Sequence, residues 1–119
     1  MPASLHHESG NLYRVEIRGT LRKSELDRVQ ESLVAQMGPI GRVRLLFVLE
    51  GFAGWEPQDN WSDMSFYVRH GDSIERIAIV GDERWREEAL MFVAADLRKG
   101  PVKFFPADAA ADARLWLVA

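Results

Sequence analysis

The stretch Val43-Arg44-Leu45-Leu46-Phe47-Val48-Leu49 is apolar at every position except Arg44. A strand that is covered by protein on both faces has this composition, because neither face meets water. Residues 74–80 have the same character, most clearly in Ile77-Ala78-Ile79-Val80. Two such strands with helical patterning between them predict a mostly parallel sheet that carries helices on both faces.

The segments on either side of these strands alternate between strand and helix patterns. Residues 12–18 alternate apolar and polar side chains, which predicts a strand with one wet face near the edge of the sheet. Residues 22–37 carry one apolar stripe at helical spacing, with Thr20 or Ser24 as its cap, and Gly38-Pro39 ends this helix. The remaining expected elements are an irregular loop over 51–57, helices over 60–69 and 83–97, a strand over 102–105, and a last helix that starts at 106–108.

The expected order places all of these elements in one α/β domain over residues 1–119, with a central, mostly parallel sheet of four to five strands and about four helices. Residues 1–9 form either a short antiparallel edge strand or a frayed terminus. The helix over 60–69 takes Asp59 or Asn60 as its cap, and its inner face consists of Trp61, Met64 and Val68. Crossovers between the parallel strands are expected to be right-handed.

Composition excludes several classes of function. The chain has no cysteine, which excludes a disulfide framework, a thiolate zinc site and a cysteine nucleophile. The net charge is −3 and no block of Lys or Arg is present, so a nucleic-acid partner is not expected. The longest apolar runs, 45–49 and 89–95, are far shorter than the roughly 20 residues of a transmembrane helix. Residues 1–10 lack the pattern of a signal peptide, so the expected location is cytoplasmic.

Two stretches of about a dozen residues resemble a known family. RLLFVLEGFAGW (44–55) resembles the RLLVxLxxFxGW stretch of the SpoIIAA-like family, and ERIAIVGDERW (75–85) resembles its ERIAVVGDxxW stretch. VKFF (102–105) and ARLWL (113–117) match the same family, so the resemblance covers roughly residues 10–118. It implies a STAS-like fold, of the type found in bacterial anti-sigma-factor antagonists, and a likeness to the CRAL/TRIO lipid-binding fold.

The resemblance also bears on function. It implies a membrane-associated role or the binding of an apolar ligand. Anti-sigma-factor antagonists carry a phosphorylatable serine in a turn before the second helix, whereas residues 54–61 of this chain contain no hydroxyl side chain before Ser62. A phosphoserine switch of that type is therefore not expected.

A ligand is expected at one edge of the sheet. In open α/β sheets ligands bind beyond the carboxyl ends of the strands, which here means residues 50–57, 81–85 and 105–108. The residues expected to line the site are aromatic or apolar side chains in or near these segments: Phe52, Trp55, Trp61, Trp85, Met91 and Phe92. Core packing is the alternative for Trp61 and Trp85. The apolar segment 89–95 is consistent with core packing, a subunit contact, an apolar ligand or a membrane.

No catalytic or metal-binding motif accompanies these residues, and no cofactor or metal is expected. Asp82 is the polar candidate, because it lies where a strand end meets a helix start, yet turn and cap roles explain Asp82 and Asp108 equally well. His6, His7 and Glu8 do not form a metal site, since neighbouring side chains of a strand point to opposite faces.

We therefore expect a non-catalytic module that binds a small apolar or amphipathic ligand or associates peripherally with a membrane. The alternative is a regulatory module that binds another protein, and a homodimer is also consistent with the pattern. An enzyme would require a convergent set of polar groups around Asp82.

Overall fold

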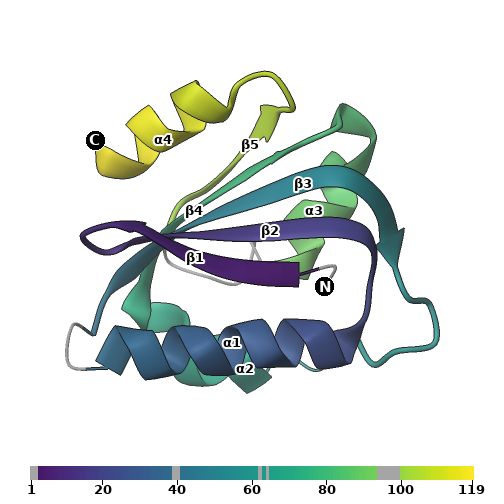
Figure 1. Ribbon diagram of the computed structural model, residues 1–119, viewed down its shortest axis with the longest axis horizontal. Coiled ribbons are helices and arrows are strands. Elements are labelled where there is room, and N and C mark those ends of the chain that lie inside the picture. The colour runs from purple at the N-terminus through teal and green to yellow at the C-terminus, as the bar shows by residue number, and fades with distance from the viewer. Residues whose placement is uncertain (1–2, 39–40, 62, 64, 94–99) are drawn as a thin grey trace.

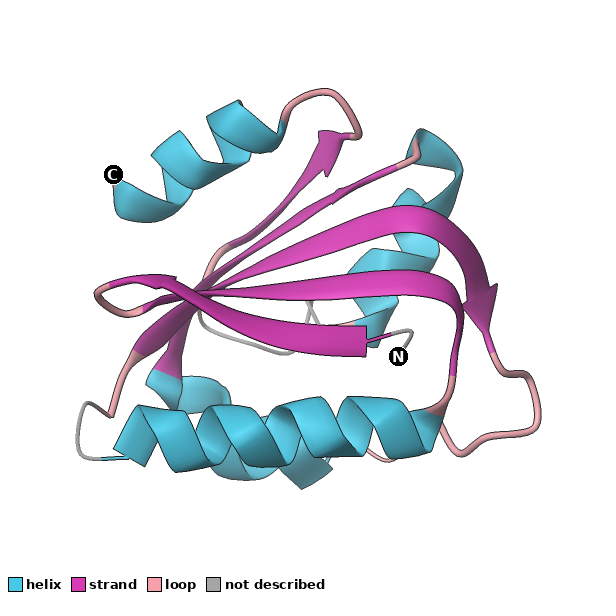
Figure 2. Cartoon of the chain, in the orientation of Figure 1, coloured by secondary structure: helices cyan, strands magenta, loops and turns pink. Residues whose placement is uncertain are grey.

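The computed structural model describes residues 3–38, 41–61, 63, 65–93 and 100–119. These residues form one five-stranded sheet in the order β1-β2-β3-β4-β5, in which only β1 and β2 are antiparallel (Figures 1 and 2). The strands are β1 Ala3–Ser9, β2 Leu12–Leu21, β3 Val43–Trp55, β4 Ile74–Gly81 and β5 Val102–Pro106. The helices are α1 Lys23–Met37, α2 Ser65–His70, α3 Arg86–Phe92 and α4 Ala110–Val118, with the short 3-10 helices η2 Gly71–Ser73 and η3 Glu83–Trp85. The predicted α/β fold class is confirmed.

Burial on both faces explains the apolar run in β3. Leu45 and Phe47 belong to a large core cluster that includes Leu33 of α1. Leu46 points the other way and packs in a second cluster that includes Leu117 of α4. Figure 1 shows α1 and α4 on opposite sides of the sheet. The alternation of adjacent side chains along a strand therefore supplies both cores from one segment.

The end of β3 differs from the prediction. Residues 51–57 were expected to form an irregular loop, but β3 continues to Trp55. Its register against the end of β2 shifts twice, and each shift inserts one extra residue into β3. Gly51 and Gly54 have φ values of +60° and +106°, which a side chain would disfavour. Bulges of this kind bend a strand, and β3 curves at its carboxyl end in Figure 1.

The second helix was predicted too early. Within the described residues α2 begins at Ser65 and not at Asn60, so Trp61 precedes the helix. Val68, expected on the inner face, is 82% exposed. Met64, the third residue of that predicted face, lies outside the described residues. Residues 94–97 of the predicted third helix also lie outside them.

Asp59 has a different partner from the one predicted. Its Oδ2 accepts a hydrogen bond of 2.8 Å from the backbone N–H of Lys23, in the first turn of α1. The N-cap residue Arg22 makes no side-chain capping bond, so neither Thr20 nor Ser24 caps this helix. A loop residue that follows β3 therefore satisfies a backbone donor at the start of α1.

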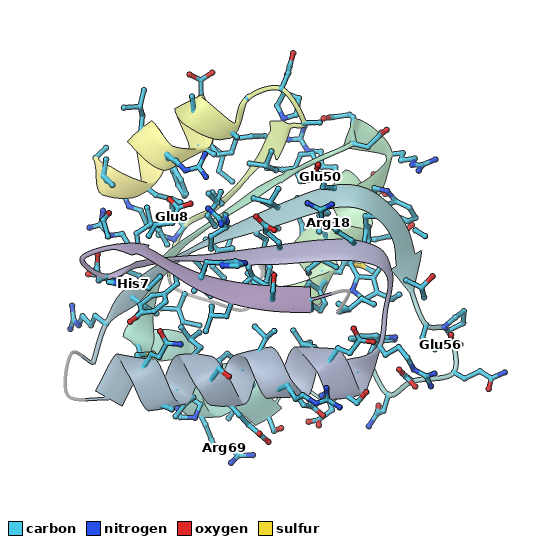
Figure 3. The ribbon with its side chains drawn as sticks, viewed as in Figure 1. His7, Glu8, Arg18, Glu50, Glu56 and Arg69 are labelled. Carbon is cyan, nitrogen blue, oxygen red and sulfur yellow. The ribbon has the colours of Figure 1, made fainter. Side chains whose placement is uncertain are left out.

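The amino-terminal segment is ordered as a strand. β1 pairs with β2, so the alternative of a frayed terminus is wrong for residues 3–9. Glu8, which Figure 3 labels, accepts hydrogen bonds from Arg114 of α4 at 2.8 and 3.0 Å and from Arg14 of β2 at 2.8 Å. These guanidinium groups, Arg114 above all, hold the pKa of the Glu8 carboxyl below its ordinary value.

Two arginines hold the carboxyl end of α4. Arg76 of β4 donates a hydrogen bond of 2.6 Å to the carbonyl oxygen of Trp116. Arg44, the one charged residue in the apolar run of β3, donates to the carbonyl oxygen of Leu117. The last carbonyl groups of a helix lack partners within the helix and carry partial negative charge, so cations are favoured there.

The close approach of β4 to β3 gives a first prediction. A Cβ atom at Gly81 would lie 2.9 Å from the Cβ of Leu49. Gly81→Ala is therefore expected to lower the free energy of unfolding by about 1–3 kcal/mol. Gly71→Ala is the matched control, because a Cβ there would meet no atom within 4 Å. Urea unfolding of both variants measures the difference, and equal stabilities would contradict the packing described.

The ion pairs of Glu8 give a second prediction. Because its pKa is lowered in the folded state, the stabilisation is present above the unfolded pKa, near 4.5, and is lost as the pH falls through the folded pKa. Glu8→Gln is expected to lower the free energy of unfolding by about 1–2 kcal/mol at pH 7. It should also reduce the loss of stability that the unmodified protein shows as the pH falls, which is the acid limb of its stability curve. Glu31→Gln, at an exposed position of α1, should change stability by less than about 0.5 kcal/mol. Thermal unfolding between pH 2 and pH 7 provides the measurement, and an unchanged acid limb in Glu8→Gln would contradict it.

Candidate functional site

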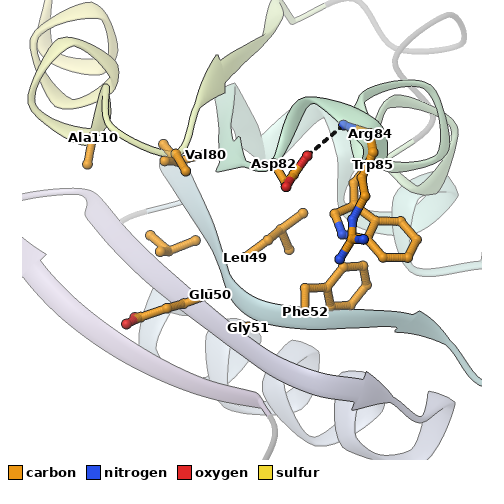
Figure 4. A pocket seen from close by; sticks show the side chains of 11 residues that line it. Leu49, Glu50, Gly51, Phe52, Val80, Asp82, Arg84, Trp85 and Ala110 are labelled. Atoms are coloured by element: carbon orange, nitrogen blue, oxygen red, sulfur yellow. Dashed lines mark hydrogen bonds between the residues drawn. The ribbon is translucent and has the colours of Figure 1, made fainter.

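A cavity of about 570 Å³ lies at the carboxyl ends of β3 and β4, beside the start of α4 (Figure 4). All three segments that the sequence placed at this edge contribute to it. Its lining consists of Val48, Leu49, Glu50, Gly51, Phe52, Val80, Asp82, Arg84, Trp85, Ala107 and Ala110. The position agrees with the general rule for ligand sites in open α/β sheets.

The turn after β4 places two of these residues. Asp82 is the N-cap of η3, and its Oδ1 accepts a hydrogen bond of 3.0 Å from the backbone N–H of Arg84. This bond closes the turn in the manner usual for an aspartate cap. It sets Arg84 and Trp85 on the same side of the cavity as Phe52 (Figure 4).

Five of the six predicted site residues form an aromatic cluster, which we define as Phe52, Trp55, Trp61, Trp85 and Phe92. The ring centroids of Phe52 lie 4.8 Å from those of Trp55 and 5.0 Å from those of Trp85. Phe92 lies 5.5 Å from Trp55 and 6.0 Å from Trp61. Most of these contacts are edge-to-face, which is a favourable arrangement. The rings therefore pack mainly on one another, and only Phe52 and Trp85 line the cavity.

Met91, the sixth predicted residue, is placed elsewhere. Its side chain is 73% exposed, and it does not line the cavity. Ala89 and Val93 are the buried residues of this segment, so its described part has one inward face. Of the alternatives for this segment, core packing therefore holds for Ala89 and Val93 but not for Met91. Ala94 and Ala95 lie outside the described residues.

The three charged side chains of the cavity differ in the partners that they already have within the protein. Oε2 of Glu50 lies 3.2 Å from Nη2 of Arg18 (Figure 3). Asp82 accepts the backbone hydrogen bond that closes its turn. The guanidinium of Arg84 lies 5.0 Å from the ring centroid of Trp85, in a cation–π contact. All three charged side chains are solvent-exposed, so they form a polar rim around an apolar wall.

The chemistry of the lining is limited. The described residues that line the cavity include no hydroxyl, thiol, imidazole or amine side chain. A nucleophile activated by a neighbouring base therefore has no counterpart among them. The described residues also contain no group of three side chains suited to hold a metal ion. His7 bonds instead to the carbonyl oxygen of Gly10 at 2.7 Å, and His6 lies 3.0 Å from the hydroxyl of Ser4.

Sequence reasoning missed Arg84, although it named the segment that contains it. Its position in the sequence was a usable signal, because Arg84 is a charged residue two positions after Asp82, within a segment expected at the ligand-binding edge of the sheet. It also missed the small residues at the start of α4, of which Ala110 lines the cavity. Alanines give no chemical signal of a site, and only the position of α4 shows their role.

A second groove of about 450 Å³ lies between α1 and α2. Its charges neutralise one another in part, since Nζ of Lys23 lies 3.8 Å from Oδ2 of Asp63. Hydrogen bonds from Ser65 are the main cause that holds the pKa of Asp63 below its ordinary value. None of the site residues predicted from the sequence lines this groove, in which His70 ends α2 and its ring centroid lies 5.3 Å from that of Phe66.

Comparison with known proteins identifies relatives of this fold. The model of the SpoIIAA-like family matches residues 12–118. The chain is similar to the crystal structure of an uncharacterised protein of the DUF3478 family with a SpoIIAA-like fold, from Shewanella loihica PV-4. The TM-score is 0.73 at 22% sequence identity, and the match covers 97% of this chain and 91% of that chain. No curated protein is significantly similar in sequence. Among the described residues, no helix has the length and apolar character that crossing a membrane requires.

The contrast between Phe52 and Met91 gives a third prediction. Phe52 is 4% exposed and contacts two tryptophan rings, so Phe52→Ala is expected to cost about 3–5 kcal/mol of folding stability. Met91→Ala should change stability by less than about 0.5 kcal/mol, because the side chain is exposed. Urea unfolding followed by tryptophan fluorescence measures both. A small effect of Phe52→Ala would show that the aromatic cluster is not a core element.

Proposed function

The chain belongs to the SpoIIAA-like family, and we propose that its cavity at the carboxyl ends of β3 and β4 binds a small amphipathic molecule without catalysing a reaction on it. The observation that carries this proposal is the composition of the cavity. An apolar wall and a charged rim meet within one volume of about 570 Å³, which lies in the range of small-molecule sites.

The wall offers apolar surface from separate elements. Leu49 and Phe52 come from β3, Val80 from β4 and Ala110 from α4. Contact with such surfaces favours the apolar part of a ligand by about 25 cal/mol for each Å² removed from water. The charged rim would keep the polar end of the same ligand in contact with solvent. An amphipathic molecule satisfies both parts, whereas a wholly polar one leaves the wall uncovered.

The placement of the aromatic rings favours a dissolved ligand over insertion into a membrane. Insertion would require exposed aromatic side chains at the surface. Phe52 is instead buried, and Trp55 and Trp85 are partly buried against it. The rings therefore support the floor of the cavity and the core beneath it.

The absence of catalysis is proposed from the side chains at hand. Asp82, the polar residue singled out in the sequence, accepts the hydrogen bond that closes the η3 turn. The other acid of the lining, Glu50, is paired with Arg18. Both carboxylates of the lining therefore already have a partner, and neither faces a hydroxyl, thiol, imidazole or amine side chain among the described residues of the cavity with which it could act as a general acid or base.

A cavity-filling substitution gives a fourth prediction. Ala110→Phe adds a ring at a position that lines the cavity, and it should weaken the binding of 1-octanol by about tenfold or more, the equivalent of 1.4 kcal/mol. Ala111→Phe is the matched control, because Ala111 is exposed on the same helix and lies outside the lining. Fluorescence titration measures the affinities, since Trp85 lines the cavity. Equal affinities in both variants, or no saturable response of the unmodified protein, would contradict the proposed function.

A further inference from the structure

We infer that the polar end of the ligand is a single carboxylate and that Arg84 binds it. This inference rests on the proposed function and narrows it to one class of ligand, a dissolved monoanionic amphipath. It follows from which of the three charged side chains around the cavity already have a partner of opposite charge or a hydrogen-bond donor.

The two acids of the cavity are already engaged. Oε2 of Glu50 lies 3.2 Å from the guanidinium of Arg18, which is outside the lining. Oδ1 of Asp82 accepts the N–H of Arg84 at 3.0 Å. Each carboxylate thus has a donor before any ligand arrives. A cationic ligand would compete with these donors, which reduces its advantage at this rim.

Arg84 differs from these two acids in its pairing. In the part of the chain that the structure describes, its guanidinium has no carboxylate within the 4.0 Å of an ion pair. Its Cζ atom lies 5.0 Å from the ring centroid of Trp85, in a cation–π contact. The N–H donors of a guanidinium lie in its plane, and two of them suit the two oxygens of a carboxylate.

The apolar wall lies next to this cation. Figure 4 shows the Arg84 side chain running beside Trp85 towards Phe52, with Leu49 across the cavity. A ligand whose carboxylate meets Arg84 can therefore lay its apolar chain against Phe52 and Leu49. The α4 helix begins at Ala110 with no side-chain cap at Ala109. Ala110 lines the cavity, so the amino-terminal end of α4, where the helix dipole is positive, also favours an anion there. This helix end would not make a site by itself.

The charge of the rim also limits the ligand. Glu50 and Asp82 lie in the same lining as Arg84, so they repel an anion, and this repulsion grows with the ligand's charge. One guanidinium offsets one negative charge. A singly charged carboxylate is therefore favoured over a doubly charged phosphate monoester of equal chain length.

The test compares eight-carbon amphipaths that differ only in the polar end. Octanoate, 1-octanol, octylammonium and octyl phosphate are titrated at pH 7 and low salt, below their aggregation concentrations, with tryptophan fluorescence as the readout. Octanoate is expected to bind about tenfold more tightly than octylammonium, as one hydrogen-bonded charge pair implies. This preference should shrink at high ionic strength, because the rim is exposed.

Arg84→Gln is expected to weaken octanoate binding about tenfold and to affect 1-octanol binding far less, because the alcohol carries no charge for the guanidinium to pair with. Arg86→Gln is the matched control, because Arg86 is exposed, lies outside the lining and pairs with Glu83 at 3.1 Å. Arg84→Lys keeps the charge but not the planar donors, and it should recover only part of the affinity. Thermal unfolding confirms that each variant is folded, which is expected since Arg84 is exposed.

The outcomes separate the two proposals. If none of the four amphipaths binds, the proposed function fails and this inference fails with it. If 1-octanol binds but octylammonium or octyl phosphate equals octanoate, or if Arg84→Gln keeps the affinity for octanoate, the cavity is a binding site and the inference is overturned. Sedimentation with phosphatidylcholine vesicles that contain oleate tests the other source of a carboxylate. Vesicle binding without any response to dissolved octanoate would also overturn it.

Discussion

The burial of β3 on both faces is the constraint on which the rest of the structure depends. Its side chains alternate between two core clusters, one under α1 and α3 and one under α4. The strand must therefore be central, with β2 and β4 as hydrogen-bonded neighbours. Because β3 is central, its carboxyl end faces the turn after β4 and the start of α4. The cavity lies where these three segments meet, so its position follows from the burial of one strand.

The sequence predicts the periodic part of this fold well and its exceptions poorly. The strands and α1 follow from side-chain periodicity, because one or two faces are buried along most of their length. The end of β3 does not, since Gly51 and Gly54 indicate a loop as readily as two bulges within a strand. Asp59 was assigned to the nearest helix, yet it bonds to α1. Local patterns cannot show a partner that lies far away in the sequence.

The candidate site shows the same division. Gathering of aromatic side chains at one edge was predictable, because parallel strands end at the same edge of the sheet. Which rings line the cavity was not, since Trp55 and Trp61 pack against Phe92 rather than the cavity. Met91 and Phe92 are neighbours of equal apolar character, and only the helix rotation separates the exposed one from the packed one. Which of the three rim charges already has a partner depends on distances in the folded chain, and no sequence pattern gives these distances.

The two arginines under α4 have a consequence for strand alignment. Arg44 and Arg76 are register partners in the β3–β4 pairing, and both donate to carbonyl groups in the last turn of α4. A slip of one residue between these strands would turn one guanidinium to the opposite side of the sheet. The helix would then lose a donor in its final turn. Docking of the carboxyl-terminal helix thus discriminates between correct and shifted alignments of two strands whose other register partners are all apolar. Apolar pairs alone would allow several alignments.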